Sequence, residues 1–319
     1  MKKIAVITSG GDSPGMNAAI RAAVRVALAQ GVEVWGIRNG YAGMIADDMI
    51  RLDSRSVGDI IQKGGTFLGT ARSEEFKTLT GRQKAAENLH SRGIEGLIVT
   101  GGDGSLTGAK LLSELGIKFV GLPGTIDNDI WGTDFTIGFD TAVNTALDAI
   151  NKLRDTASSH GRVILVEVMG RHCGWIALTA GLAGGAEIIL VPEEPFNQED
   201  ISKKLLESRA KGKQYSIIVV AEGAGSALEL GQYIRANSGL ETRVSVLGHI
   251  QRGGAPTAFD RLLASRLAET AVRALMAGKT DIMIGFRNNQ CVEVPIADAV
   301  GKKKEIDPEL YRLADVLSK

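Results

Sequence analysis

Short apolar runs alternate with helix-like segments along most of the chain. Residues 3–8 form a β-branched run, residues 17–31 place apolar side chains at helical spacing and end in glycine, and residues 32–37 form the next apolar run. The same succession recurs at 96–104 and 105–116, 118–124, 162–170 and 175–185, 187–193, and 215–223 and 227–239. Continuous apolar strands that alternate with helices predict an α/β fold with mainly parallel sheets covered by helices on both faces.

The chain is long enough to form two domains. It has 319 residues, and no Pro/Ser-rich linker or low-complexity run separates two halves. We therefore expect more than one sheet, and domain boundaries that the chain crosses more than once.

Composition narrows the class of partner and compartment. Hydrophobic residues make up 44% of the chain, and 37 basic residues balance 37 acidic ones, so the whole molecule has no net field to attract nucleic acid or an anionic membrane. Cys173 and Cys291 form no CxxC pair, which argues against a disulfide framework or a structural zinc site. No run approaches about 18 apolar residues. We expect a cytoplasmic protein that is neither secreted nor membrane-bound.

The first polar loop follows the first predicted strand, at Thr8–Arg21 (TSGGDSPGMNAAIR). Glycines allow a ligand to approach the backbone, and the following helix offers free N–H groups to a phosphate. The loop is not G-x-G-x-x-G and lacks the Walker lysine, and GKT at 278–280 has Arg273 where that motif needs glycine. Both a phosphate site and a tight βα turn remain open.

The second loop is Thr100–Ser105 (TGGDGS), again directly after a strand. Its glycines leave N–H groups accessible to phosphate oxygens, and Asp103 is a hard oxygen ligand suited to Mg²⁺. These features favour a site for a metal and a nucleotide. A glycine-rich turn with a capping aspartate is the alternative.

The third loop follows the apolar run at 118–124 and contains Thr125, Asp127, Asn128 and Asp129. Clustered carboxylates repel one another unless a metal, a cation or a substrate hydroxyl is present. A general base beside a metal would use this arrangement, whereas an aspartate helix cap with solvated neighbours would also explain it.

Arginines also gather in the predicted loops and at strand ends. They are Arg72, Arg162, Arg171, Arg243 and Arg252, with His249 close to the last. Planar bidentate donors suit phosphate recognition. Each arginine alone is better explained as a solvated surface charge, but their joint placement in loops favours an anionic ligand.

Eight segments together resemble one enzyme family. TSGGDSPGMNAAIR, GGTFLGTAR, GGDGS, PGTIDND, EVMGRHCG, AGGAE, VLGHIQRGG and FDRLLASRLA, in this order and over essentially the whole chain, are similar to bacterial ATP-dependent 6-phosphofructokinase. The resemblance implies Mg²⁺-dependent transfer of the ATP γ-phosphoryl group to the 1-hydroxyl of fructose 6-phosphate. It implies two Rossmann-like three-layer α/β/α domains with the active site in the cleft between them, and a homotetramer (a dimer of dimers) with shared active sites.

The resemblance also implies domain boundaries and residue roles. The larger, ATP-binding domain would comprise residues 1–138 and 251–301, and the smaller, fructose 6-phosphate-binding domain residues 139–250 and 302–319. Asp127 would be the base, Thr125, Arg72 and Arg171 would assist catalysis, Asp103 would bind Mg²⁺, and Asp129 would act on the metal through water. ATP would contact Gly11, Arg72, Ser73, Gly102, Asp103, Gly104 and Ser105. Fructose 6-phosphate would contact Thr125, Ile126, Asp127, Met169, Gly170, Arg171, Glu222, His249, Ile250, Gln251 and Arg252, with Arg162 and Arg243 supplied by a neighbouring subunit.

Two glycines predict the phosphoryl donor. Pyrophosphate-dependent relatives typically carry Asp at the position of Gly104 and Lys at that of Gly124, where the side chains fill the space of the ATP α-phosphate. Both positions are glycine in this chain, so ATP is the expected donor.

The family's effector site, which binds ADP or phosphoenolpyruvate between subunits, is altered. Its positions are Arg21, Arg25, Asp59, Arg154, Gly185, Glu187, Lys211, Lys213, Gln214 and Tyr215. Of these, Arg21, Arg25, Asp59, Arg154, Glu187, Lys211 and Lys213 match the family pattern in position or charge. Ser54 and Lys211 replace arginines, and Gln214 and Tyr215 replace a Lys-His pair. Each lost contact weakens anion binding by about 1–3 kcal/mol, so we expect weak or absent regulation by phosphoenolpyruvate and ADP. Trp175 is a second departure, at a position where relatives often have a small residue.

Two other functions are considered. A kinase of the NAD or diacylglycerol type also uses a GGDG turn, but its second domain is rich in β-structure. A non-catalytic sugar-phosphate sensor would need the arginines but not Asp127 beside a metal site.

Overall fold

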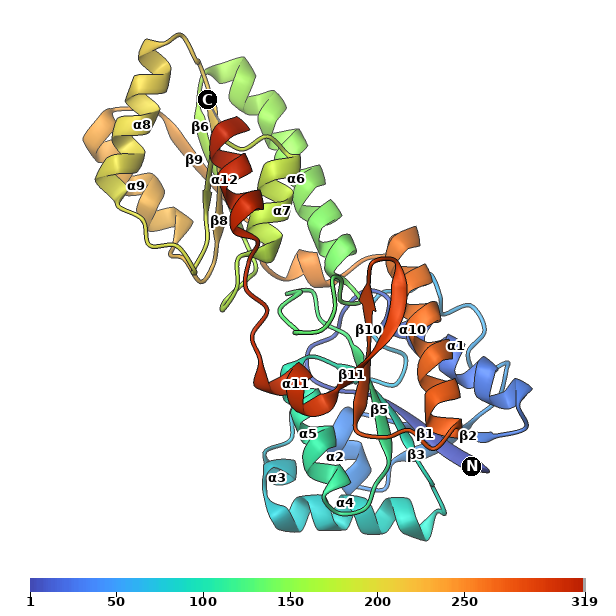
Figure 1. Ribbon diagram of the computed structural model, residues 1–319. Coiled ribbons are helices and arrows are strands. Elements are labelled where there is room, and N and C mark those ends of the chain that lie inside the picture. The colour runs from blue at the N-terminus through green and yellow to red at the C-terminus, as the bar shows by residue number, and fades with distance from the viewer. Residues whose placement is uncertain (318–319) are drawn as a thin grey trace. The chain divides into compact units, whose positions relative to one another are not determined.

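A computed structural model describes residues 1–317 as two compact units. Unit 1 comprises Met1–Thr141 and Arg252–Lys304, and unit 2 comprises Ala142–Gln251 and the segment from Glu305 onward (Figure 1). The chain first passes between the units inside α6 (Phe139–His160), so one helix belongs to both. The domain boundaries predicted from the sequence lie after residues 138, 250 and 301. Residues 318 and 319 of the predicted smaller domain lie outside the described residues.

Unit 1 is built on a seven-stranded sheet within the described residues, in the order β11-β10-β5-β4-β1-β2-β3. The outer strands β3 and β11 run antiparallel to β2 and β10, and the remaining pairs are parallel. The strands are β1 (Lys3–Thr8), β2 (Glu33–Ile37), β3 (Met49–Leu52), β4 (Leu97–Gly101), β5 (Phe119–Pro123), β10 (Ile282–Arg287) and β11 (Gln290–Pro295).

Helices cover both faces of this sheet (Figure 1). Alternate residues of β1 divide between two cores, because successive side chains on a strand point to opposite faces. Ile4 and Val6 pack with α1 (Met16–Ala29) and α10 (Ala258–Met276), whereas Ala5 and Ile7 pack with the opposite layer. That layer contains α2 (Gly40–Ile45), α4 (Leu79–Ser91), α5 (Asp103–Ser113) and α11 (Ile296–Gly301), with the short α3 (Glu74–Lys77) beside α4.

Unit 2 is built on a four-stranded parallel sheet within the described residues, in the order β7-β8-β6-β9. Helices α8 (Gln198–Ala210) and α9 (Ala227–Ser238) pack on one face, while α7 (Trp175–Ala183) and α12 (Pro308–Leu317) lie on the other with α6. The strands are β6 (Val163–Val168), β7 (Ile188–Leu190), β8 (Ser216–Ala221) and β9 (Thr242–Val246), and a 3-10 helix, η1 (Gly248–Arg252), follows β9. The predicted α/β fold with mainly parallel sheets is confirmed.

Asp260 holds the start of α6. Its buried carboxylate accepts hydrogen bonds from the backbone N–H groups of Gly138 (2.9 Å) and Thr141 (2.8 Å) and from the Thr141 hydroxyl (2.5 Å). These N–H groups lie at a helix N-terminus, where no intrahelical acceptor exists. Burial raises the pKa of Asp260 to about 6, and the nearby charge of Asp140 acts in the same direction against the lowering effect of the hydrogen bonds.

This elevated pKa predicts a pH-dependent stability. Because the pKa in the fold lies above the ordinary 3.8, the folded state holds the proton more tightly than the unfolded state. The contribution of Asp260 to stability is therefore present at low pH and is lost as the pH rises through about 6. In Asp260→Asn this loss is absent, although the variant is less stable by about 1–3 kcal/mol because its amide N–H₂ faces other donors.

Urea unfolding of the intact chain between pH 4.5 and about 7 measures this difference. Asp307→Asn is a matched control, because Asp307 accepts a backbone hydrogen bond from Glu309 at 2.9 Å at the exposed start of α12. The control should keep the wild-type slope. An Asp260→Asn variant with that same slope would show that another group titrates.

Candidate active site

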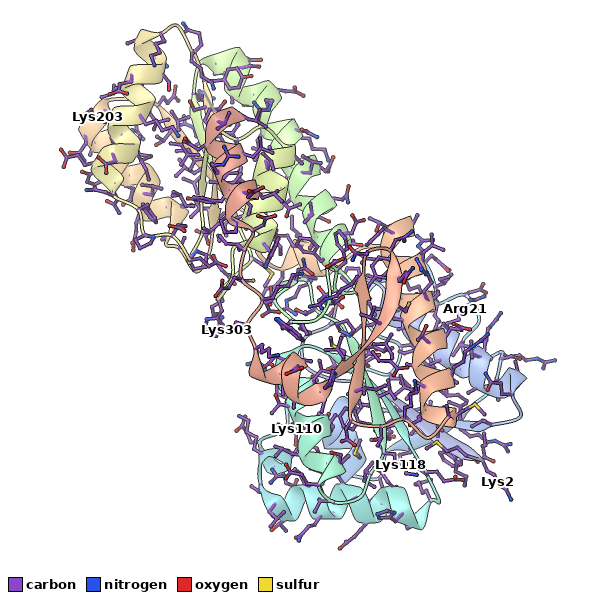
Figure 2. The ribbon with its side chains drawn as sticks, in the orientation of Figure 1. Lys2, Arg21, Lys110, Lys118, Lys203 and Lys303 are labelled. Atoms are coloured by element: carbon purple, nitrogen blue, oxygen red, sulfur yellow. The ribbon has the colours of Figure 1, made fainter. Side chains whose placement is uncertain are left out.

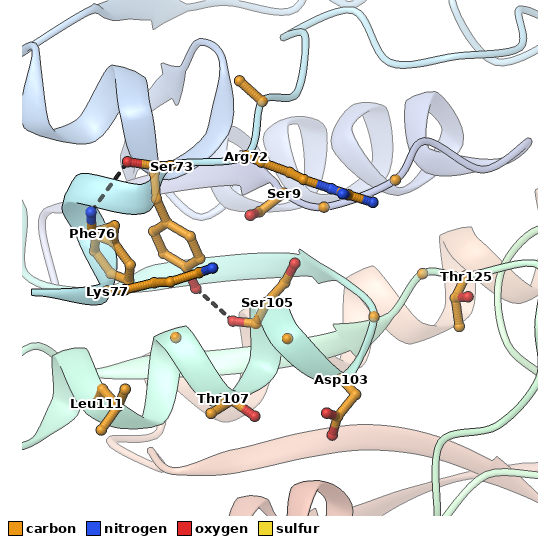
Figure 3. A pocket seen from close by; sticks show the side chains of 18 of the residues that line it. Ser9, Arg72, Ser73, Phe76, Lys77, Asp103, Ser105, Thr107, Leu111 and Thr125 are labelled. Carbon is orange, nitrogen blue, oxygen red and sulfur yellow. Dashed lines mark hydrogen bonds between the residues drawn. The ribbon is translucent and has the colours of Figure 1, made fainter. Parts of the chain in front are cut away.

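One cavity of about 690 Å³ lies in unit 1, at the carboxyl ends of β1, β4 and β5 (Figure 3). All three predicted polar loops contribute to its walls. Its lining includes Gly11, Arg72, Ser73, Gly102, Asp103, Gly104, Ser105, Gly124, Thr125, Asp127, Asp129 and Arg252. The structure therefore brings together the residues that the sequence predicted for a nucleotide and a metal, because parallel strands end at one edge of a sheet.

The loop after β1 is tied to the segment that carries Arg72. The Thr70 hydroxyl donates to the carbonyl oxygen of Gly10 at 2.7 Å, and the side chains of Thr8 and Thr66 are hydrogen-bonded at 2.7 Å. Gly10 has φ 85°, a conformation that glycine adopts without strain. These bonds fix one wall of the cavity, and the Arg72 side chain points into it (Figure 3).

The second loop forms the beginning of a helix. The sequence pattern predicted a helix from Ser105, but α5 starts at Asp103, directly after β4 and Gly102. No side chain caps this N-terminus. The Ser105 N–H donates to the Gly102 carbonyl oxygen at 2.9 Å, whereas the N–H groups of Asp103 and Gly104 lie at the start of the helix, where no intrahelical acceptor exists. The GGDGS segment therefore presents a helix N-terminus to the cavity, which is a favourable position for an anion.

The opposite end of the cavity is aromatic and was not predicted. Tyr41 and Phe76 stack with ring centroids 3.9 Å apart, and the Tyr41 hydroxyl donates to the Ser105 carbonyl oxygen at 2.6 Å. Gly108 allows this packing, because a Cβ at that position would lie 2.8 Å from the Tyr41 ring. Tyr41 and Phe76 belong to short helices with little periodicity, so no sequence pattern marks them. The cavity thus combines a polar end with an apolar end, as a nucleotide requires.

Ser73 has a structural role besides lining the cavity. Its hydroxyl accepts a hydrogen bond from the Phe76 N–H at 3.2 Å and caps α3. At the rim, Lys77 pairs with Glu74 at 2.7 Å. The cap holds the aromatic residue in place beneath the cavity.

The loop after β5 owes its shape to Asn128. This residue is 1% exposed and has φ 55°, and its side chain accepts from the Thr136 N–H (3.0 Å) and donates to the Asp134 carbonyl oxygen (3.1 Å). The Thr125 carbonyl oxygen also accepts from the Thr136 hydroxyl at 2.6 Å. Asn128 is therefore a buried support between Asp127 and Asp129, which both line the cavity.

Asp103 and Asp129 form the candidate metal site. Burial raises the pKa of Asp103, and the negative charge of Asp129 raises it further. Two carboxylates that raise each other's cost of ionisation are suited to binding a hard cation, which offsets their charge. Mg²⁺ characteristically takes one or two carboxylates and fills its remaining coordination positions with water and phosphate oxygens. No group of three or more His, Cys, Asp or Glu in residues 1–317 could hold a metal alone. The donor set therefore fits a cation that arrives with a phosphate ligand.

Arg252 lies in unit 1, at the phosphate-loop end of the cavity. A Cβ at Gly11 would lie 2.1 Å from its guanidinium Nη1, which donates to the Asp12 carbonyl oxygen at 3.3 Å. Its buried Nε has no hydrogen-bond partner within residues 1–317. The sequence grouped Arg252 with His249 in one motif, but Arg252 is part of unit 1 and His249 part of unit 2.

Several predicted sugar-phosphate residues gather at the carboxyl ends of β6 and β8 in unit 2. Glu222 donates its N–H to Val168 at 2.8 Å, and the Gly223 N–H donates to Gly170 at 3.1 Å. Gly170 has φ 133°, and this turn leaves the Arg171 side chain exposed. Met169 is buried directly after β6. The segment after β9, which runs parallel to β6, contains exposed His249 and Ile250 and buried Gln251, whose side chain donates to Gly248.

Two predicted sugar-phosphate arginines lie at the other end of the unit 2 sheet. Arg162 precedes β6, and Arg243 is the second residue of the neighbouring β9. Both pair with Glu241, at 3.0 Å and 2.6 Å, and the pKa of Glu241 is lowered chiefly by its hydrogen bond to Arg162. A six-residue strand separates them from Arg171 by about 20 Å, so Arg162 and Arg171 of one chain cannot contact the same small ligand.

Ile126 is the one predicted contact residue of the acidic loop whose side chain is fully enclosed. It is 1% exposed, so any contact it makes with a ligand uses its backbone.

Comparison with known proteins gives a family match that includes residues of both units. A family model described as phosphofructokinase matches residues 3–275. The chain belongs to the phosphofructokinase family. The predicted resemblance is thereby confirmed.

Relatives of this family match over their full length. An ATP-dependent 6-phosphofructokinase of Bacillus pumilus (strain SAFR-032) is 59% identical, and one of Clostridium botulinum (strain Loch Maree / Type A3) is 56% identical. In both cases the match covers all of both chains.

Among residues 1–317, none of the helices combines the length and the apolar character that a membrane span requires.

Solved phosphofructokinase structures share the fold. The Saccharomyces cerevisiae enzyme is 40% identical with a TM-score of 0.89, and the match covers 94% of this chain but 45% of the yeast chain. A pyrophosphate-dependent phosphofructokinase from Marinobacter aquaeolei is 25% identical with a TM-score of 0.87, covering 97% of this chain and 86% of that one. The fold alone therefore does not distinguish the two phosphoryl donors.

The predicted effector positions of this phosphofructokinase occur in both units. Arg21 and Arg25 lie on α1, where Figure 2 labels Arg21, and Arg25 donates to the Ser54 carbonyl oxygen at 3.4 Å. Asp59 is exposed with φ 50°. In unit 2, Arg154 donates to the Gly185 carbonyl oxygen at 2.8 Å and lies 5.9 Å from the Tyr215 ring centroid, Lys213 pairs with Glu187 at 3.0 Å, and Lys211 and Gln214 are exposed.

The proximity of the Asp129 carboxylate to Asp103 predicts a change in the pKa of Asp103 when Asp129 is neutralised. In Asp129→Asn the pKa of Asp103 should fall, because the neutral amide removes a neighbouring negative charge. It should not fall to the ordinary value, since burial is the larger cause of the elevation. A carboxyl ¹³C NMR titration of the cation-free protein measures the change. Asp12→Asn, at an aspartate outside this pair, should leave the pKa of Asp103 unchanged, and an unchanged pKa in Asp129→Asn would contradict the assigned coupling.

Proposed function

We propose that the chain is an ATP-dependent 6-phosphofructokinase, which transfers the ATP γ-phosphoryl group to the 1-hydroxyl of fructose 6-phosphate in glycolysis. The products are fructose 1,6-bisphosphate and ADP. The observation that carries the proposal is the presence, in one cavity, of the α5 N-terminus with Asp103 and of the loop with Asp127 and Asp129. The identity of 56–59% to ATP-dependent 6-phosphofructokinases over the whole chain supports it.

The nucleotide is assigned to the cavity of unit 1. The free N–H groups at the start of α5 and the backbone at Gly11 bind phosphate oxygens, and the stacked Tyr41 and Phe76 form the apolar end. Arg72 extends into the cavity and offsets negative charge on the transferred group, an electrostatic contribution that dominates this kind of reaction. In the proposal Arg171 has the same role.

Asp127 is assigned as the general base. Its backbone N–H donates to the Thr125 hydroxyl at 3.2 Å, which orients the start of the loop. The carboxylate accepts the proton of the sugar 1-hydroxyl as the hydroxyl oxygen attacks the γ-phosphorus. Mg²⁺, when bound with ATP, would be held by Asp103 with Asp129 acting through water, and would neutralise charge on the phosphate oxygens.

Fructose 6-phosphate is assigned to Met169, Gly170, Arg171, Glu222, His249, Ile250, Gln251 and Arg252, together with the loop at Thr125–Asp127. We assign Arg162 and Arg243 to the sugar phosphate of a neighbouring subunit. Their location at the amino end of the unit 2 sheet, opposite the end that carries Arg171, supports this sharing. Such sharing requires at least two subunits, and we assign the active form as a homotetramer, a dimer of dimers.

The two donor-selecting glycines have different surroundings. A Cβ at Gly104 would meet nothing within 4 Å, whereas a Cβ at Gly124 would lie 2.8 Å from the Thr100 side chain and 3.1 Å from that of Met16. The open space at Gly104 supports ATP as the donor. At Gly124 the absence of a side chain is also required by packing.

We assign weak effector regulation to this chain. Two of the three unit 2 cations at the effector positions already have internal partners, since Arg154 contacts Gly185 and the Tyr215 ring, and Lys213 pairs with Glu187. An incoming anion must displace these contacts before it binds. The site also lacks the arginine that Ser54 replaces, and with it a bidentate donor.

The two alternative functions are less well supported. The parallel α/β unit 2 is unlike the β-rich second domain of NAD and diacylglycerol kinases. A sensor of sugar phosphates requires no base, so the role of Asp127 separates it from the kinase.

Asp127→Ser tests this role. Loss of the base should lower kcat by about 10²–10⁴-fold while fructose 6-phosphate binding is largely retained. Steady-state kinetics and calorimetric titration of fructose 6-phosphate measure the two effects. Asp148→Ser removes an exposed carboxylate that pairs with Lys152 on α6, and should leave both unchanged. Full turnover by Asp127→Ser would exclude the assigned base.

A single steady-state comparison tests donor and regulation together. With fructose 6-phosphate present, ATP should support turnover and pyrophosphate should not, because both Gly104 and Gly124 lack the side chains of pyrophosphate-dependent relatives. Phosphoenolpyruvate added to the ATP reaction should inhibit only weakly. Faster turnover with pyrophosphate would contradict the donor assignment, and complete inhibition at micromolar phosphoenolpyruvate would contradict weak regulation.

A further inference from the structure

The acidic loop at residues 125–136 is anchored on the side away from its cavity-lining carboxylates. The Asp134 N–H donates to the Phe286 carbonyl oxygen at 2.7 Å, the Phe286 N–H donates to the Thr133 hydroxyl at 2.9 Å, and the Asn288 N–H donates to the Asp134 carboxylate at 3.0 Å. Residues 133–134 therefore lie along the end of β10. Since Asn128 bonds to both Asp134 and Thr136, this attachment determines where Asp127 and Asp129 lie.

A second attachment comes from residues 302–304, the last residues of unit 1 before the chain enters unit 2. Ile130 and Lys303 form an antiparallel bridge, and Lys304 donates to the Asp134 carbonyl oxygen at 2.7 Å. Figure 2 labels Lys303 in this segment. Both contacts fall within six residues of Asp129, so the acidic loop and this connecting segment are joined.

Trp131 connects the two attachments. Its ring centroid lies 4.3 Å from the Lys302 Nζ and 4.9 Å from the Arg287 guanidinium carbon. Lys302 is held by Asp298 at 2.8 Å, and Arg287 is the last residue of β10. Cations within about 6 Å of an aromatic centroid are attracted to the ring, most strongly to tryptophan. Trp131 thus joins the loop to the β10 end and to the connecting segment at once.

The acidic loop needs such an anchor because its charges oppose its position. Asp103 and Asp129 line the same cavity, so two like charges face one ligand space before a cation is bound. A loop free to move would relieve this repulsion by carrying Asp129 away from the cavity. An anchor two residues further along the chain resists that displacement.

We propose that Trp131, Arg287 and Lys302 form a cation–aromatic clamp that positions Asp127 and Asp129, with Trp131 as a positioning residue for catalysis and for Mg²⁺-nucleotide binding. Its effect on turnover rests on the proposed function, whereas its effect on the loop does not. The family motif PGTIDND ends at Asp129, so Trp131 lies outside the segments that carry the resemblance.

Trp131→Leu tests the clamp, with Trp35→Leu as the matched control. Trp35 also lies under two cations, Lys3 at 5.7 Å and Arg92 at 5.0 Å, but it belongs to β2 and does not line the cavity. Both variants lose one tryptophan–cation cluster of unit 1. Only Trp131→Leu should loosen the acidic loop.

Amide hydrogen exchange of the full-length protein provides a readout independent of activity. Exchange in the 125–136 segment should be at least about tenfold faster in Trp131→Leu than in wild type and unchanged in Trp35→Leu. Trp131→Phe keeps an aromatic face and should restore most of the protection. Arg287→Gln/Lys302→Gln keeps the ring but removes both cations. Its 125–136 segment should also exchange at least about tenfold faster than in wild type, so it tests the clamp even if Trp131→Leu does not fold.

Kinetics then test the catalytic consequence. Trp131→Leu should lower kcat about tenfold and raise the Mg²⁺ concentration for half-maximal rate, because misplacing a reacting group by about 1 Å is costly. Trp35→Leu should stay within about twofold of wild type. Unchanged exchange in both Trp131→Leu and the double glutamine variant would overturn the clamp. Faster exchange in Trp131→Leu with unchanged kcat and unchanged Mg²⁺ dependence would overturn its positioning role. Absence of turnover in the wild type would instead contradict the proposed function.

Discussion

Repulsion between Asp103 and Asp129 is the constraint around which the unit 1 site is organised. The two carboxylates follow neighbouring strands, β4 and β5, and the charge of one raises the pKa of the other. Such an arrangement persists only if the backbone on both sides is held in place or a cation joins the pair. The polar contacts of unit 1 supply that support, from the start of α5 to the far side of the acidic loop.

Support for the two carboxylates comes from different kinds of structure. Asp103 is the first residue of an 11-residue helix packed on the sheet, and the hydroxyl of Tyr41 bonds to its first turn at Ser105. Asp129 lies in an irregular loop, where the buried Asn128 amide substitutes for a regular ladder of backbone hydrogen bonds. The helix is inherently rigid, whereas the loop depends on side-chain contacts with β10 and residues 302–304.

Much of this could be predicted from the chain because the relevant signals are local. Apolar runs at residues 3–8 and 97–101 and the glycines after them show where strands end, and parallel strands place those ends along one edge. The aromatic end of the cavity could not be predicted, because Tyr41 and Phe76 meet only when α2 and α3 pack near α5. The helical start at Asp103 was missed because glycines on both sides of it indicate a turn.

By itself the sequence determined the α/β class, the family, and the residue types available for phosphate, metal and base, since these depend on periodicity and short ordered segments. The tertiary structure decided which of those residues meet. It assigned Arg252 to the Gly11 end of the unit 1 cavity, and it placed Arg162 at the end of β6 opposite Arg171. It also showed that Asn128 is a buried support between two cavity-lining acids. These outcomes depend on contacts between residues distant in sequence, which no local pattern encodes.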